Sequence, residues 1–242
     1  TLRAICSPTL VPIERRRSPS QDAGPARVLA LESRRPYIPL PQPNESQGGT
    51  VGPMTYTLHQ GDLPDGLDLG PVVAIDTETM GLQVHRDRLC LAQLSSGDGT
   101  AHLVQFQAGH YDAPNLRRLL ADPNVLKLFH FARFDLAAMG HWLGAWAAPV
   151  YCTKVASKLV RTFTDKHGLK DLCKELIGVD IAKQQQSSDW GAPTLSEEQL
   201  KYAASDVLHL HRLKGVLDGM LERENRAGLA AAAFAYLPAR AY

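Results

Sequence analysis

The stretch VVAIDTETMGL, residues Val72 to Leu82, decides the fold expected of this 242-residue chain. An apolar run over residues 72–75 is typical of a buried strand; it leads directly into Asp76 and Glu78, and a Met-Gly turn follows. Side chains two residues apart on a strand point to the same face, so the two carboxylates converge. Such close carboxylates raise each other's pKa unless a cation neutralises them, and Mg²⁺ prefers oxygen ligands. The motif favours a metal site, with a solvated strand end as the alternative.

Strand-like and helix-like patterns surround this motif and predict an α/β domain with a mixed sheet. Strands are expected at 71–76, 88–96, 100–106 and 125–131, and a strand or turn at 148–152. A Gly-Asp-Gly turn joins the second and third strands as a hairpin, so we expect the early strands to be antiparallel. Helices are expected at 113–122, 132–143, 153–162, 168–178 and, as one long helix or two end to end, after an N-cap at Ser196. An Ala-rich helix near the end of the sequence is expected to dock on the domain.

Residues 1–53 differ in composition from the rest, because they hold 9 of the 16 prolines together with the basic run ERRRSPS. Such a segment cannot bury enough apolar surface to offset the entropy of ordering it. We therefore predict a disordered or non-native N-terminal extension over 1–53, with Met54 as the natural start, and one domain over 54–242. A basic arm that contacts nucleic acid is the alternative.

The overall composition limits the class of protein. With 44% hydrophobic residues, 21% charged residues and a formal net charge of +1, the chain has no global bias toward a polyanionic partner. Its four cysteines (Cys6, Cys90, Cys152, Cys173) show no zinc-site spacing and are typical of buried thiols in a reducing compartment. No apolar run is long enough to span a membrane, and no signal peptide is visible, so we expect a cytoplasmic protein without a membrane partner.

Two further groups of polar residues extend the chemistry of the first motif. Asp135, in LFHFARFDLAAM, falls in the first turn of a helix that follows a buried strand; a plain helix-terminal charge would explain it as well. Tyr202 and Asp206, in YAASD, lie four residues apart on one helix face among small residues. A structural hydrogen bond between these two is the alternative to a functional role.

The three motifs AIDTETMGL, HFARFDLAAM and YAASDVLHL, in this order, resemble those of the ribonuclease D type of 3′→5′ exonuclease. This family belongs to the DEDD superfamily, and the tyrosine four residues before Asp206 indicates its DEDDy subclass. The segment GLKDLCKELIGVDIAKQQQSSDW is similar to the same proteins. The resemblance implies a ribonuclease H-like fold, a mixed five- or six-stranded sheet flanked by helices. Only 36 residues follow Asp206, so the chain resembles a short form without the HRDC domains of longer members.

The resemblance also implies a mechanism. Asp76, Glu78, Asp135 and Asp206 would bind two divalent metal ions, Mg²⁺ or Mn²⁺, about 4 Å apart. One ion would activate a water and the other would stabilise the leaving 3′-oxygen, releasing nucleoside 5′-monophosphates. Tyr202, whose ordinary pKa is about 10, is a poor base at neutral pH and would orient the water instead.

Substrate contacts are expected around these carboxylates. We predict that Thr77, Met80, Leu82, His130, Phe134 and Lys183 bind substrate; apolar packing is the alternative for Met80 and Leu82. Phe131 or Phe134 could stack on a base or belong to the core. His130, His209 and His211 lack a partner pattern, which favours a structural role for them. A local excess of cations could meet phosphates or only solvate a helix face: Lys154, Lys158, Arg161, Lys166, Lys170 and Lys174.

The expected partner is the single-stranded 3′ end of RNA, in tRNA-type 3′ processing or in decay. A 3′→5′ DNA exonuclease of the same superfamily is a second hypothesis, because the motifs do not distinguish ribose from deoxyribose. A catalytically weak nucleic-acid-binding module with the same fold is a third.

Overall fold

Six strands form one mixed sheet in the computed structural model, which describes residues 55–181, 185 and 187–241. Across the sheet their order is β1-β4-β3-β2-β5-β6. Their bounds are β1 Thr55–Gln60, β2 Val72–Thr79, β3 Leu89–Ser95, β4 Thr100–Gln105, β5 Leu126–Phe129 and β6 Val150–Cys152. The prediction of a mixed sheet of five or six strands is confirmed.

The pairing follows from how the strands are connected. β2, β3 and β4 are antiparallel neighbours, and the turn between β3 and β4 contains Gly97 and Gly99, both at positive φ. β2 is parallel to β5, and β5 is parallel to β6, as expected for strands joined through helices. The strand with the Asp-x-Glu motif therefore lies in the interior of the sheet, with Val73, Ala74 and Ile75 fully buried.

Seven helices accompany the sheet in the described part of the chain: α1 Pro114–Ala121, α2 Arg133–Leu143, α3 Thr153–Val160, α4 Leu169–Ile177, α5 Glu197–Leu208, α6 Leu210–Arg223 and α7 Ala227–Ala241. Ser196 caps α5 in a capping box, because its hydroxyl accepts from the Gln199 amide while the Gln199 side chain accepts from the Ser196 amide. His209 separates α5 from α6, so the predicted long helix is two helices end to end.

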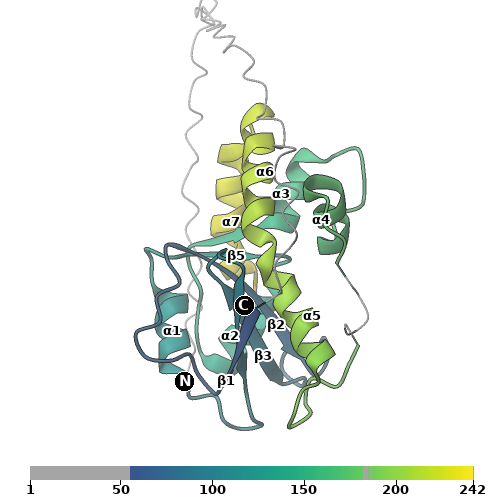
Figure 1. The fold of residues 1–242 in the computed structure, drawn as a ribbon. Helices are drawn as coiled ribbons and strands as arrows, with labels where there is room; N and C mark the ends of the chain where they lie inside the picture. The colour runs from purple at the N-terminus through teal and green to yellow at the C-terminus, as the bar shows by residue number, and fades with distance from the viewer. Residues whose placement is uncertain (1–54, 182–184, 186, 242) are drawn as a thin grey trace, which may run out of the picture. The chain divides into compact units, whose positions relative to one another are not determined.

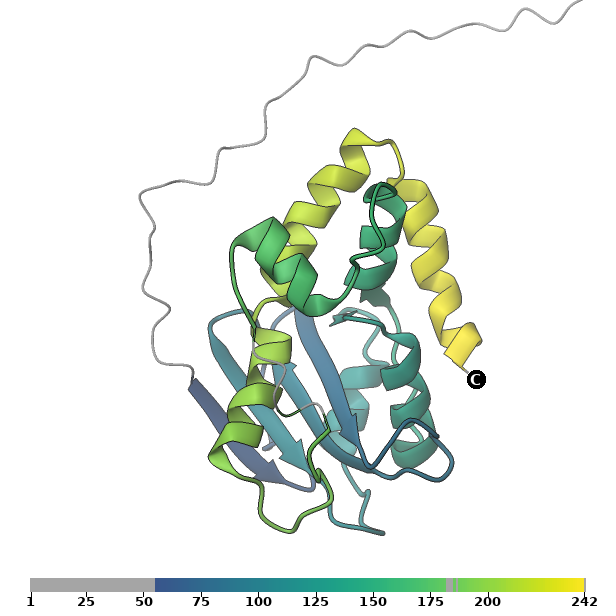
Figure 2. The ribbon, with the colours of Figure 1, turned by 90° about the vertical axis from the view of Figure 1, so that its right-hand side faces the viewer.

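The helices lie on both faces of the sheet and beyond one of its ends (Figure 1, Figure 2). α5 crosses one face against β1 to β4, and α2 packs on β2 and β3. Figure 2 shows these two helices on opposite sides of the sheet, with α6 continuing away from it toward α3 and α4. This arrangement brings the end of α5, β2 and the start of α2 together.

The C-terminal Ala-rich helix α7 docks as predicted. Ala230 and Phe234 are buried, and the Phe234 ring lies 4.4 Å from that of Tyr151, centroid to centroid. Cys90, Cys152 and Cys173 are free and buried, which confirms their prediction as small hydrophobic residues. Among the described residues, no helix is both long and apolar enough to cross a membrane.

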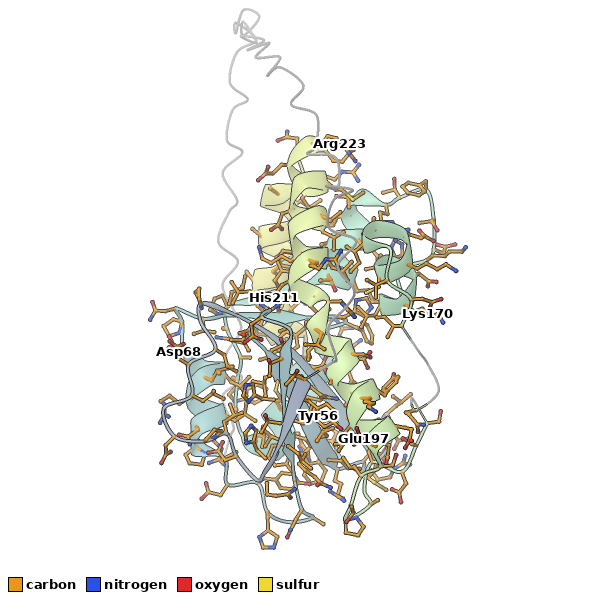
Figure 3. All side chains as sticks on the ribbon, viewed as in Figure 1. Tyr56, Asp68, Lys170, Glu197, His211 and Arg223 are labelled. Atoms are coloured by element: carbon orange, nitrogen blue, oxygen red, sulfur yellow. The ribbon has the colours of Figure 1, made fainter. Side chains whose placement is uncertain are left out.

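Strand β1 was absent from the sequence-based prediction. Its run TYTLHQ is mostly exposed, because it is an edge strand that pairs with β4 alone. Tyr56, which hydrogen-bonds to Glu197, connects β1 to the first turn of α5, and Figure 3 labels both residues there. A short exposed strand gives little alternation of apolar and polar residues, so its pairing depends on long-range contacts.

Residues 1–53 and Lys183 lie outside the described residues. The predicted boundary between an N-terminal extension and one exonuclease domain stays a prediction. His211, labelled in Figure 3, donates from Nε2 to the carbonyl oxygen of Val72 at 2.9 Å, at the start of the central strand. That contact accounts for His211 as a structural residue.

Candidate active site

Three carboxylates meet where β2 passes beneath α5. Asp76 and Glu78, two residues apart, point to the same face of β2, and Asp206 comes from the last turn of α5. Each offers an oxygen within 4.8 Å of the others, and all three side chains are half-buried. Directly after Glu78 the β2–β3 ladder slips by a β-bulge, a distortion often found beside active sites. Asp206, which follows Glu78 by 128 positions in the chain, thus joins Asp76 and Glu78 in one acidic cluster.

Asp135 lies next to this cluster but is held separately. It is buried in the first turn of α2 and accepts a hydrogen bond of 2.7 Å from the Thr77 hydroxyl. Thr77 stands between Asp76 and Glu78 on the strand, so its side chain points to the opposite face, toward α2. The Thr77 side chain therefore orients Asp135, and substrate binding by Thr77 stays a prediction.

Tyr202 lies one turn before Asp206 on α5 and hydrogen-bonds to it. The helix that carries both is anchored at its start, because the Gln199 side chain donates to the Ser188 hydroxyl and to the Asp189 carbonyl. This contact fixes part of the SSDW segment against α5. The i, i+4 spacing predicted from the sequence is confirmed as a shared helix face.

Burial and mutual repulsion dominate the electrostatics of the site. Burial raises the pKa of Asp76 to about 7. The pKa of Glu78 is raised well above its usual value by burial and by the charges of Asp76, Asp206 and Asp135. The pKa values of Asp135 and Asp206 are raised by burial and by Asp76. No cation among the described side chains neutralises the cluster, which is the condition under which a divalent ion is needed.

Asp76, Glu78 and Asp206 line a pocket of about 330 Å³ together with positively charged, aromatic and aliphatic residues. Lys154 of α3 and Lys170 of α4 line it, as do His130 and Phe131. Two of the six predicted cations, Lys154 and Lys170, thus line this pocket. Arg161 is fully buried and paired with Glu175, so both alternatives, phosphate contact and a solvated helix face, are wrong for this residue.

A second pocket, of about 660 Å³, adjoins the first at Phe131, which lines both. Its walls include Leu82, Arg133, Phe134 and Trp146. Phe131 is 49% exposed and has a φ of 69°, a conformation rare outside glycine, and the Lys154 ammonium lies 4.2 Å from its ring centroid. Non-glycine residues held in this conformation cluster at functional sites.

The predicted substrate residues are distributed between these pockets. His130 and Thr77 line the first pocket, and Leu82 and Phe134 line the second. Met80 and Leu82 are exposed by 51% and 85%, so neither is a plain core residue. Met80 and Leu82 lie in a loop that Asp87 closes. The Asp87 carboxylate accepts a hydrogen bond from the Gln83 amide at 2.9 Å and pairs with Arg86.

Sequence reasoning missed the second pocket as a unit. Trp146 enters it from the segment between α2 and β6, far from any motif, and no local spacing indicated it. The exposed aromatic side chain of Phe131 was considered only as a stacking alternative, because its unusual backbone conformation leaves no trace in the sequence.

A mixed sheet whose central strand and crossing helix supply an acidic cluster defines a ribonuclease H-like nuclease of the DEDD type. The chain belongs to the 3′-5′ exonuclease family, whose sequence profile matches residues 63–222. Ribonuclease D from Gluconacetobacter diazotrophicus is 40% identical over 167 residues, covering 69% of this chain and 42% of that protein. The chain therefore spans less than half the length of this relative.

Solved structures of NrnC from Brucella melitensis are similar over nearly their whole length. The structure with bound Mg²⁺ is 55% identical with a TM-score of 0.75 and covers 78% of this chain and 92% of that one. The structure bound to pGG is 56% identical with a TM-score of 0.76 and the same coverage. Together with the match to ribonuclease D, these similarities confirm the resemblance to 3′-5′ exonucleases.

Proposed function

We propose that this chain is a 3′→5′ exoribonuclease that removes nucleoside 5′-monophosphates from RNA 3′ ends with the help of two divalent metal ions. The observation that carries the proposal is the meeting of Asp76, Glu78 and Asp206 within 4.8 Å, beside a pocket with lysines in its wall. Family membership supports the reaction class. The bound Mg²⁺ of the similar NrnC supports the choice of cation.

The donor set fits hard divalent cations. All ligands in the cluster are carboxylate oxygens, and neither histidine nor cysteine belongs to it. Asp76, Glu78 and Asp206 would hold the ions, with Asp135, kept in place by Thr77, completing the set. Bound Mg²⁺ or Mn²⁺ supplies charge stabilisation at the phosphate and lowers the pKa of water.

The reaction itself forms one bond and breaks one. A water oxygen bonds to the scissile phosphorus, and the bond from phosphorus to the 3′-oxygen of the preceding nucleotide breaks. One proton of the water ends on that leaving oxygen, which becomes a hydroxyl, and the other stays on the new phosphate or passes to solvent. Lys154 and Lys170 line the pocket and would balance phosphate charge. The second pocket, with Leu82, Phe131 and Trp146, would receive a neighbouring base by stacking.

Tyr202 would orient the attacking water as a neutral phenol. Burial and the nearby charges of Asp206, Glu78 and Asp76 raise its pKa, so it keeps its proton at neutral pH and cannot act as a base. Because its hydrogen bond to Asp206 fixes the phenol, the oxygen has a defined position relative to the acidic cluster. Positioning of this kind is worth about a hundredfold in rate.

Replacing Tyr202 tests that role. We expect Tyr202→Phe to lower kcat about a hundredfold while leaving KM and the affinity for Mn²⁺ unchanged, because only the hydroxyl is removed. Single-turnover kinetics and calorimetric Mn²⁺ titration measure the two effects. Tyr236→Phe, at an exposed site on α7, is the matched control. An unchanged kcat in Tyr202→Phe would contradict the assignment.

Two substrate sizes compete within the proposal. Similarity to Escherichia coli RNase D, an exoribonuclease involved in structured RNA processing, suggests structured RNA, whereas similarity to an NrnC bound to pGG suggests very short oligonucleotides. The coverage of NrnC is nearly complete and that of ribonuclease D is partial, so we favour single-stranded RNA ends, down to two nucleotides.

The test of the function is an end-label assay with Mg²⁺. Single-stranded RNA and DNA of one sequence, labelled at the 5′ end, should give a ladder that shortens from the 3′ end, with RNA degraded faster. A 3′-phosphate should slow the first step, and a 5′-phosphorylated dinucleotide should be cleaved to mononucleotides. Internal fragments at early times would indicate an endonuclease, and binding without any cleavage would favour the catalytically weak module.

A further inference from the structure

The imidazole of His130 is a wall of the catalytic pocket with a defined hydrogen-bond pattern. His130 follows β5 directly, and its Nδ1 lies 2.9 Å from the hydroxyl oxygen of Thr153, the first residue of α3. The same hydroxyl lies 3.2 Å from the carbonyl oxygen of Phe129. Thr153 is completely buried, so water does not alter this arrangement.

Counting protons in this chain of contacts fixes the histidine tautomer. The Thr153 hydroxyl carries one hydrogen, and the Phe129 carbonyl can only accept, so the hydroxyl donates to Phe129. Its oxygen is then free to accept, and His130 must donate from Nδ1–H. A neutral imidazole protonated at Nδ1 carries a bare lone pair on Nε2.

The surroundings keep Nε2 unprotonated. Burial, with the nearby positive charge of Lys154, lowers the pKa of His130 to about 3. Nε2 has no hydrogen-bond partner among the described residues, and His130 lines the same pocket as Asp76, Glu78 and Asp206. His130 therefore adds a neutral acceptor to a pocket that also contains carboxylates and lysines.

A neutral acceptor in this place selects for a particular donor on the ligand. Phosphate oxygens bear no proton at neutral pH, so their lone pairs would repel Nε2. Nucleobase donors differ from base to base, whereas the hydroxyls of the terminal sugar are present on every RNA 3′ end. The terminal sugar is also joined to the scissile phosphate, which the acidic cluster would hold in this pocket.

We propose that His130 Nε2 accepts a hydrogen bond from a hydroxyl of the 3′-terminal ribose and so makes the enzyme select for that sugar. This inference rests on the proposed exonuclease function and adds the group that reads the sugar. If the hydroxyl is the 2′-OH, His130 distinguishes RNA from DNA; if it is the 3′-OH, His130 distinguishes free ends from blocked ends.

The test uses three short RNAs that differ only in the last sugar: adenosine, 2′-deoxyadenosine or 3′-deoxyadenosine. For the unchanged protein with Mg²⁺ we expect kcat/KM to fall about tenfold on one of the two deoxy ends, the loss typical of one hydrogen bond. His130→Phe keeps a planar ring but has no acceptor. In that variant the ratio of kcat/KM on the ribose end to kcat/KM on the same deoxy end should approach one.

Thr153→Val is the second variant, because it preserves shape and removes the hydroxyl that fixes Nδ1–H. In this variant the His130 imidazole can take either tautomer. We therefore expect its kcat/KM ratio between the ribose end and the deoxy end to lie between the ratios of the unchanged protein and of His130→Phe. Circular dichroism checks the fold of both variants. If His130→Phe does not fold, the inference is tested by the kcat/KM ratios of the Thr153→Val variant and the unchanged protein.

Several outcomes would overturn the inference. One is equal kcat/KM on all three ends for the unchanged protein. Another is an equal loss on all three ends in His130→Phe, which would mark His130 as structural. A change that follows the terminal base, when uridine replaces adenosine, would point to base contact instead. Failure of the exonuclease function itself is distinguishable, since ordinary RNA would then not shorten from its 3′ end at all.

Discussion

Asp76→Asn abolishes exonuclease activity, with an expected loss in kcat/KM of at least about a thousandfold, because it removes one charged oxygen ligand from the proposed metal set. The same change takes a repelling charge out of the acidic cluster, where burial raises the pKa of Asp76 to about 7. The metal-free variant should therefore be more stable than the unchanged protein at pH 8, by roughly 1–3 kcal/mol. A large loss of activity with a gain in stability is the signature of a functional carboxylate.

The measurements are 3′-end degradation with Mg²⁺ and chemical unfolding in EDTA. Asp112→Asn is the matched control, since the Asp112 side chain is 91% exposed and, within the described part of the chain, forms an ion pair with Arg117 alone. This control should change neither activity nor stability by a measurable amount. Full activity in Asp76→Asn would refute the site, and a loss of activity accompanied by unfolding would show that Asp76 is structural.

The parts of the site that depend on local spacing could be predicted from the sequence. Asp76 and Glu78 share a strand face because side chains alternate, and Tyr202 and Asp206 share a helix face because they are four residues apart. Both pairs of residues also lie in sequence motifs of the family, and the order of these motifs along the chain supported the prediction. The fold class followed from the same alternation, so the mixed sheet and the helix after Ser196 were expected.

The parts that depend on distant packing could not be predicted. The role of Thr77 as a donor to Asp135 joins residues 58 positions apart. A count of cations could not separate Lys154, which lines the pocket, from Arg161, which is buried against Glu175. The chain of contacts from Phe129 through Thr153 to His130 likewise appears only when β5 and α3 are placed side by side.

These distant contacts give the pocket an asymmetric distribution of charge. The strand and the crossing helix supply negative charge to the pocket. Its neutral or positive groups include His130 and Phe131, which directly follow β5, and Lys154 from the first turn of α3. A phosphodiester needs cations at its phosphate and uncharged groups at its sugar and base, so an asymmetric pocket suits a nucleic-acid end. The Lys154 ammonium over the Phe131 ring connects the charged part of the pocket to the aromatic part.

Metal removal should stop the reaction and change how stability depends on pH. In EDTA we expect no exonuclease activity, and Mg²⁺ or Mn²⁺ should restore it, because the acidic cluster alone offers no charge stabilisation to a phosphate. The stability effect has a definite sign. Each carboxylate whose folded-state pKa is raised stabilises the folded protein while it stays protonated. That stability is present below the unfolded-state pKa and is lost as the pH rises through the folded one.

For Asp76 in the metal-free protein this pH window runs from the ordinary pKa of 3.8 to the raised pKa of about 7. The melting temperature in EDTA should therefore fall between pH 5 and pH 8, and by less in Asp76→Asn. Mg²⁺ should raise it more at pH 8 than at pH 5, since protons occupy the carboxylates at the lower pH. Differential scanning calorimetry at these two pH values measures both effects. A Mg²⁺-induced shift that is the same at both, or EDTA-resistant degradation, would show that the cluster does not bind the catalytic cation.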